Sequence, residues 1–296
     1  MDKLKIGYLD QSFEIAVDKF KILLGKNFHT KFEILKSIIQ YFEKKSYSEY
    51  QKQNNVNCLV EMNERRLDVK QWDLISINHY FDLNQDIKLG SKSLLLKYFE
   101  TMLRDLEYND IVNTINILLG DLNENIIKDK IYKENSNINL NANIQNLNLK
   151  SIIKLLEVNI EKDMVEAHGY DLNYDEIICF QLDLIEQIVT QNVEKRFFVI
   201  VDIPALSLKI FQKLQEVIGA ITIINTDKIN KEVQFDINDV CYINKQITDM
   251  SMDDKIYYDI IMELPFNLTI DEFKIEFTNM INNNYNDKSR YLNKLL

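Results

Sequence analysis

One segment near the N-terminus governs our interpretation of the chain: Leu23-Leu24-Gly25-Lys26-Asn27-Phe28-His29-Thr30-Lys31-Phe32. Apolar side chains alternate before it, at Phe13, Ile15 and Val17. Apolar side chains recur every three to four residues after it, at Phe32, Leu35, Ile38, Ile39 and Phe42. Alternation is typical of a strand and the wider spacing of a helix. The sequence therefore predicts a strand, a tight glycine turn and an amphipathic helix.

This order is the local architecture of a phosphate-binding loop, in which a glycine and four further residues precede Gly-Lys-Ser or Gly-Lys-Thr. Gly25 and Lys31 match the first glycine and the lysine. Thr30 takes the place of the second glycine, and Phe32 that of the hydroxyl that holds Mg²⁺. Since a phenylalanine cannot bind a metal, we expect no nucleotide hydrolysis and no bound nucleotide.

Length and composition predict a folded protein with one large domain or two smaller ones. The chain has 296 residues, of which 46% are hydrophobic and 10% aromatic. Six glycines and two prolines are few, which favours long helices and regular strands over flexible linkers.

Charge is distributed unevenly along the chain. The net charge is −11, yet residues 1–66 carry 12 basic and 9 acidic residues. An acidic protein binds a polyanion only by gathering its cations on one surface. The asymmetry permits such a surface, and an ordinary solvated surface of mixed charge explains the same counts.

The cysteines and the hydropathy pattern indicate a cytoplasmic protein. Cys58, Cys179 and Cys241 are widely separated and suit neither disulfide pairing nor a zinc site, so we expect buried free thiols in a reducing compartment. We find no evident signal peptide and no apolar run near the length of a membrane span.

The second half of the chain predicts a parallel sheet. The apolar runs Arg196–Asp202 and Ala220–Asn225 flank an amphipathic helix over Ser207–Ile218. Asp202, at the end of the first run, is either a Walker-B-like acid or a helix-capping or turn residue after the strand. We therefore expect an α/β head formed by residues 1–82 and 191–248.

The rest of the chain predicts a helical insertion over residues 83–190 and an extension over 249–296. We expect two long helices between residues 86 and 129 with a break near Asn109-Asp110, and an irregular asparagine-rich connection over 134–148. Further helices are predicted over Leu149–Val158 and over Asp175–Thr190, the latter capped by Asp175. The extension predicts a strand over Ile256–Met262 and a helix from Asp271.

Several segments, taken in order, carry a family resemblance: Leu4-Lys5-Ile6, Gly25 to Lys31, Ile75-Ser76-Ile77 with Phe81-Asp82-Leu83-Asn84, Ser93 to Lys97, Ile152 to Val158, and Phe197 to Leu206. In their order and spacing the chain resembles the Csn-two family, the CRISPR-associated proteins that support spacer acquisition in type II-A antiviral defence. The chain is similar to the longer subtypes, because residues 249–296 exceed the length of short members.

The resemblance implies an α/β head related to phosphate-loop ATPases, with a sheet that contains parallel strands, split by an inserted α-helical leg. It also implies a ring-shaped homotetramer that holds double-stranded DNA in a central hole and prefers free ends. Calcium would stabilise the tetramer. The protein would not be an enzyme, and its partners would be DNA ends, the CRISPR integrase and the type II effector nuclease.

The candidate DNA contacts are basic residues: Lys26, Lys31, Arg65, Arg66, Lys92 and Lys97. The sequence carries no helix-turn-helix or zinc-finger signature, so no element that could read DNA bases is evident. Sequence-independent binding needs only cations facing phosphates, and fourfold symmetry would repeat each of them four times.

The candidate calcium ligands are acidic residues: Asp121, Glu124, Asp129 and Glu134. The family carries its acids just before the helix that corresponds to Leu149–Val158, where this chain is rich in asparagine. Asparagine carbonyls bind calcium without adding charge, so we expect weaker affinity.

Two other functions remain open from the sequence. One is a nucleotide-binding regulator that uses the degenerate phosphate loop. The other is an assembly scaffold with no DNA contact.

Overall fold

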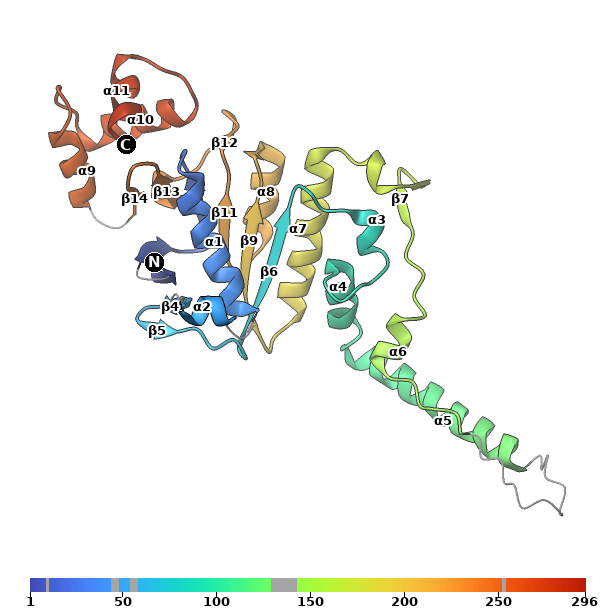
Figure 1. Ribbon diagram of the computed structural model, residues 1–296. Helices are drawn as coiled ribbons and strands as arrows, with labels where there is room; N and C mark the ends of the chain where they lie inside the picture. The colour runs from blue at the N-terminus through green and yellow to red at the C-terminus, as the bar shows by residue number, and fades with distance from the viewer. Residues whose placement is uncertain (9–10, 44–47, 54–57, 129–142, 252–253) are drawn as a thin grey trace. The chain divides into compact units, whose positions relative to one another are not determined.

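The computed structural model describes residues 1–8, 11–43, 48–53, 58–128, 143–251 and 254–296 (Figure 1). The chain forms two compact units, one of Met1–Phe81 with Asn173–Leu296 and the other of Asp82–Leu172. The second unit differs from the predicted insertion, 83–190, chiefly in helix α7 (Tyr174–Gln191), which belongs to the first unit.

A small antiparallel sheet opens the first unit, with the strand order β2-β1-β4-β5. Its strands are β1 (Asp2–Tyr8), β2 (Gln11–Val17), β4 (Leu59–Met62) and β5 (Arg65–Arg66). Asn63 and Glu64 join β4 to β5 with φ values of 49° and 64°, the conformation of a tight two-residue hairpin turn. The strand indicated by the alternation of Phe13, Ile15 and Val17 is confirmed as β2.

The larger sheet has six strands in the order β14-β13-β3-β11-β9-β6. Its strands are β3 (Phe20–Leu24), β6 (Trp72–Asn78), β9 (Arg196–Asp202), β11 (Ala220–Asn225), β13 (Val240–Ile243) and β14 (Ile247–Asp249). The pairs from β13 through β6 are parallel, whereas β14 is antiparallel to β13. The sheet is therefore mixed, and the parallel pairing predicted for residues 196–225 is confirmed.

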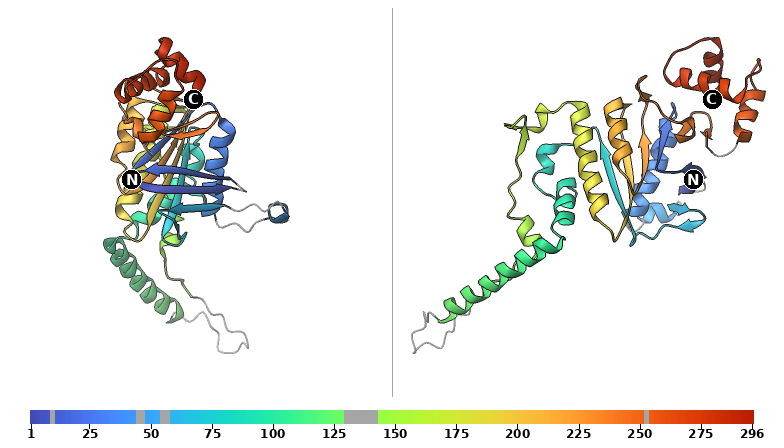
Figure 2. Two further views of the ribbon diagram at one scale, coloured as in Figure 1. Left: turned by 90° about the vertical axis from the view of Figure 1, so that its left-hand side faces the viewer. Right: turned by 180° about the vertical axis from the view of Figure 1, so that it is seen from behind.

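Helices cover both faces of the larger sheet. Helix α1 (Phe28–Phe42) lies on one face, and α7 and α8 (Leu208–Glu216) lie on the other (Figure 2). Strand β9 is buried from Phe197 to Val201, as expected of a strand that is covered on both sides. The short strands β10 (Ala205–Leu206) and β12 (Lys228–Ile229) form a separate parallel pair, and α2 spans Glu49–Gln53.

The buried face of α1 differs from the predicted one. Phe32 was expected in the core and Lys31 on the solvent face, yet Phe32 is 62% exposed and Lys31 is 1% exposed. Lys31 shares a helical face with the buried Ile34, Leu35 and Ile38. A lysine can occupy that face because its ammonium has partners of its own, which a pattern of apolar residues does not reveal.

Three helices end the first unit: α9 (Asp254–Met262), α10 (Ile270–Ile281) and α11 (Asp287–Leu295). The predicted strand over Ile256–Met262 is wrong, because the segment is helical and buries Tyr257 and Ile260 at helical spacing. The predicted helix near Asp271 is confirmed. The cap of α7 is Asn173 rather than Asp175, and Glu176 completes a capping box.

The second unit contains α3 (Leu83–Asp86), α4 (Leu94–Met102), α5 (Leu106–Lys128), α6 (Leu149–Ile153) and a hairpin of β7 (Ile160–Lys162) and β8 (Val165–Ala167). The break between the long helices falls at 103–105, not near Asn109-Asp110. Helix α6 ends before Val158, and the hairpin was not predicted.

The asparagine-rich connection is irregular over its described part, residues 143–148, as predicted. It runs along α5, where the Asn116 side chain exchanges hydrogen bonds with the backbone of Leu147 at 2.7 and 2.9 Å. Within the described residues, no helix combines the length and apolarity needed to cross a membrane.

Candidate phosphate-loop site and its cations

The turn that leads from β3 to α1 requires glycine. Gly25 has φ +117°, and a Cβ atom at this position would lie 2.1 Å from the carbonyl oxygen of Ile243. Glycine alone adopts this conformation readily and allows so close an approach of two backbones. The glycine turn predicted from the sequence is thus present, packed against the end of β13.

Asn27 closes the loop onto the strand beside it. Its backbone N–H donates to Ile243 O at 3.2 Å, and its Nδ2 donates to Asn244 O at 2.8 Å. Its Oδ1 accepts the backbone N–H of Thr30 at 3.1 Å and so caps α1. Backbone N–H groups that wrap a phosphate point at the ligand, whereas the Asn27 and Thr30 groups are bonded within the chain.

Lys31 is anchored at the end of β11. Its Nζ lies 2.9 Å from Asp227 Oδ1 and 3.0 Å from Thr226 O. The prediction that Lys31 faces a DNA phosphate is therefore corrected, because its ammonium is buried and its charge is neutralised by Asp227. Lys31 fixes α1 to the sheet instead.

Asp202 also has a partner within the chain. Asn225 Nδ2 donates to Asp202 Oδ1 at 2.7 Å, and the two residues face each other at the ends of β9 and β11. This contact joins the ends of β9 and β11.

A basic and aromatic surface on α1 and the loop before it was missed in the sequence, apart from Lys26. We call it the α1 surface and define it as Lys26, Phe28, His29, Phe32 and Lys36. Phe28 and Phe32 are 61% and 62% exposed, and Lys36 Nζ lies 5.6 Å from the centre of the Phe32 ring. The available signal was the spacing of Lys31, Ile34 and Ile38, which turns Phe32 outward.

The other basic candidates lie in two separate units. Arg65 and Arg66 are exposed on β5, and the Arg66 guanidinium lies 5.4 Å from the centre of the Tyr41 ring. Lys92 is exposed just before α4, and Lys97 is partly exposed on α4. Within the first unit, Lys26 therefore lies on the loop before α1, and the two arginines lie on β5.

Two of the four calcium candidates can be located. Asp121 and Glu124 are exposed and lie three residues apart on α5, while Asp129 and Glu134 fall outside the described residues. Calcium takes six to eight oxygen ligands. The described part of the chain brings together no group of three or more metal-ligating acidic, histidine or cysteine side chains. Asp121 and Glu124 alone do not fit a calcium site.

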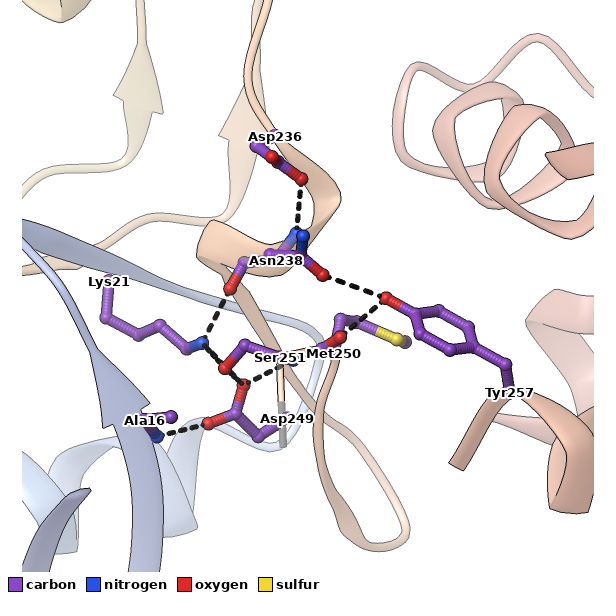
Figure 3. Close-up of polar contacts among 8 residues, drawn as sticks. All are labelled: Ala16, Lys21, Asp236, Asn238, Asp249, Met250, Ser251 and Tyr257. Atoms are coloured by element: carbon purple, nitrogen blue, oxygen red, sulfur yellow. Dashed lines mark hydrogen bonds and ion pairs between the residues drawn. The ribbon is translucent and has the colours of Figure 1, made fainter. Parts of the chain in front are cut away.

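A buried polar cluster joins the larger sheet to the C-terminal helices (Figure 3). Lys21 Nζ lies 2.5 Å from Asp249 Oδ1, and it donates to Asn238 O and Ser251 Oγ at 2.8 Å each. The other Asp249 oxygen accepts the Ala16 backbone N–H at 2.6 Å. A buried charge needs such partners, and here every donor of the ammonium has one.

Tyr257 connects α9 to the same cluster. Its hydroxyl lies 2.5 Å from Met250 O and 3.1 Å from Asn238 Oδ1. Nearby, burial raises the pKa of Asp239 to about 6, and the negative charge of Asp236 adds to this rise. All these contacts lie inside one packed unit, which assigns the cluster a structural role.

These elements define a mixed α/β protein whose larger sheet contains parallel strands. The chain is similar in structure to Stu0660 of Streptococcus thermophilus, with a TM-score of 0.69 over 95% of this chain and 86% of that chain. The two sequences are 12% identical, so the likeness shows the fold alone. No family model and no curated protein matches the sequence.

Proposed function

We propose that this protein binds double-stranded DNA ends without reading their sequence, as a ring-shaped homotetramer that supports spacer acquisition in type II-A CRISPR defence. The proposal starts from the ordered motifs that resemble the Csn-two family. In it, the unit of residues 1–81 and 173–296 is a phosphate-loop-ATPase-like head, and residues 82–172 are an inserted helical leg.

The observation that carries the proposal is the closed loop between β3 and α1. The Asn27 N–H is bonded to Ile243 O, and Lys31 is paired with Asp227. A nucleotide phosphate would have to break both contacts to use these groups. This supports a nucleotide-enzyme fold that serves a function other than hydrolysis.

Exposed cations supply the binding chemistry in this proposal. Lys26 and Lys36 lie on the α1 surface, whereas Lys31 is omitted because Asp227 neutralises it. The other candidates remain those predicted from the sequence: Arg65, Arg66, Lys92 and Lys97. Contacts of this kind release counterions from DNA, so affinity falls steeply with salt.

Calcium and the protein partners remain predictions carried by the resemblance. A calcium site would need Asp129, Glu134 or asparagine carbonyls in addition to Asp121 and Glu124. The CRISPR integrase and the effector nuclease are the proposed partners, in the cytoplasm.

One feature favours a second candidate, a nucleotide-binding regulator. Strand β3 lies between β11 and β13: the chain runs from β3 to β6 on the β11 side, and it later crosses from β11 to β13 on the opposite side. Ligands of α/β proteins bind beyond the carboxyl ends of strands at such a point, where the Gly25 turn lies. For this function, the closed loop between β3 and α1 would have to open before a nucleotide phosphate could bind.

Gel shifts with linear and closed circular duplex, with and without ATP and Ca²⁺, separate these candidates. We expect the linear form alone to shift, at low salt, whether or not ATP is present, and a tetramer on size exclusion. Tight ATP binding in calorimetry without a shift of linear DNA would overturn the proposal in favour of the regulator. A defined oligomer that has no salt-sensitive DNA affinity would indicate the scaffold.

A charge-reversed pair of variants locates the DNA surface. Lys26→Glu with Lys36→Glu should weaken binding and reduce its salt dependence. Lys19→Glu with Lys70→Glu is the matched control. Both lysines are exposed, and they lie just before the parallel strands β3 and β6, whereas the α1 surface follows the other end of β3. Equal salt dependence in the two double variants would remove the α1 surface from the DNA path.

A further inference from the structure

We propose that the second unit carries a binding site for a small amphipathic anion, an aliphatic chain with a carboxylate or phosphate head. The site is a cavity of about 520 Å³ between the loop that follows α3, helix α4 and helix α6. Small-molecule sites typically have about 300–1,000 Å³. The site is independent of the DNA function proposed above.

The apolar lining of the cavity is entirely aliphatic. It consists of Ile87, Leu89, Leu96, Ile153 and Leu156. No aromatic ring is among the lining residues, so a nucleobase would find no ring to stack on. A flexible hydrocarbon chain gains from burial against any aliphatic surface. The lining therefore favours an alkyl chain over a nucleotide.

Two of the three cations in the polar lining lie on the α6 side. Lys150 and Lys154 are exposed and lie four residues apart, and their ammonium groups have no hydrogen-bond or ion-pair partner among the described residues. Like charges at this spacing repel each other. An anionic head between them would relieve that repulsion and form charge-assisted hydrogen bonds.

The other polar lining residues set the orientation of the ligand. Glu100, on α4, also lines the cavity and would repel an anionic head. The head would therefore bind at α6, with the alkyl chain directed toward α4. Lys88 also lines the cavity, and its Nζ is held 3.1 Å from Gln85 Oε1.

The loop that forms one wall is strained and firmly held. Leu89 has φ +52°, a left-handed conformation that is unfavourable for a leucine. Its N–H donates to Asp86 O at 3.0 Å, and the buried Asp86 carboxylate accepts the N–H groups of Leu94 and Leu95 at 2.8 and 2.9 Å. Strained residues persist where their surroundings fix them, and they cluster at ligand clamps. The leucine wall is thus preorganised for a ligand.

Calorimetry with octanoate, decanoate, decyl phosphate and decanol, each below its aggregation concentration, tests the proposal. All three anions should bind the full-length chain, and affinity should rise by up to about fourfold for each CH₂ added between octanoate and decanoate. Tighter binding of decyl phosphate would identify a phosphate ester as the source, and tighter binding of decanoate a carboxylate. Decanol binding as tightly as decanoate, or no binding of any of the three anions, would overturn the proposal.

Variants assign the binding to this cavity. Lys150→Gln with Lys154→Gln should weaken decanoate binding at least tenfold, whereas Arg104→Gln, at an exposed cation of the same unit outside the lining, should not. Leu89→Gly should weaken binding at least fivefold without lowering the unfolding midpoint, because glycine accepts the positive φ. Unchanged decanoate affinity in either lining variant would overturn the site.

Discussion

The Lys21 ammonium lies 2.5 Å from Asp249 Oδ1, and the two side chains are only 1% and 2% exposed. This ion pair joins the central strand β3 to the edge strand β14, and Ser251 and Asn238 satisfy the remaining donors of the ammonium. A pair so deeply buried stabilises the fold only as long as both partners are present.

Removal of one partner should therefore cost much more than removal of both. Lys21→Met leaves Asp249 buried without its cation, and we expect the free energy of unfolding to fall by about 3–5 kcal/mol. Lys21→Met combined with Asp249→Leu should restore part of that loss. Urea denaturation measures both changes.

The control is Lys5→Met, which removes the exposed pair between Lys5 and Glu14 at 3.8 Å. It should cost at most about 1 kcal/mol. If Lys21→Met were as stable as Lys5→Met, the role assigned to the Lys21–Asp249 pair would be contradicted.

Gly25→Ala should destabilise the protein strongly, because the added Cβ would lie 2.1 Å from Ile243 O and φ is +117°. Gly120→Ala is the matched control. It lies within α5, where a Cβ meets no atom within 4 Å, and alanine should add about 0.5–1 kcal/mol of helix stability. Chemical denaturation should thus give shifts of opposite sign, and two equal shifts would contradict the closed loop.

Asp239 should make the protein less stable as pH rises through the acid range. Its folded-state pKa is about 6, raised mainly by burial from an ordinary value of 3.8. Between these values the folded state binds more protons than the unfolded state, so the free energy of unfolding falls as pH rises.

Asp239→Asn removes this titration. The variant should be more stable than the parent at pH 7, and its stability should fall less between pH 4 and pH 6. Glu232→Gln, at an exposed carboxylate, controls for the loss of one negative charge. An identical pH dependence of the parent and the Asp239 variant would refute the assignment.

The three thiols should react only after unfolding. Cys58, Cys179 and Cys241 are buried, and burial raises the pKa of the Cys179 and Cys241 thiols. A disulfide reagent at pH 7.5 should label no thiol in the folded chain and all three in guanidinium. Ser12→Cys supplies an exposed thiol as a positive control. Fast labelling of the parent chain would show that a cysteine is accessible.

Much of the fold was predictable because its strands carry unambiguous patterns. The apolar runs of β9 and β11 predicted buried parallel neighbours, and Gly25 marked the turn into α1. The segment Ile256–Met262 was not predictable in this way, because a short apolar run suits a strand or a helix until its buried face is known.

The candidate site was less predictable than the fold. Lys31 resembles a free surface lysine in the sequence, and its burial depends on Asp227, which lies 196 residues away in the chain. The pairing of Lys21 with Asp249 is likewise invisible to a local pattern. Charged residues reveal their partners only once the fold brings distant segments together.

The position of β3 between β11 and β13 also determines when the protein can fold. Neither neighbour of this apolar strand exists until residues 220–243 have been synthesised. At about 5–20 residues per second, the ribosome needs about 10–40 s to make the intervening 200 or so residues. During that interval the nascent chain holds Phe20–Leu24 without its partners, so assembly of the sheet is late and depends on protection of this strand from aggregation.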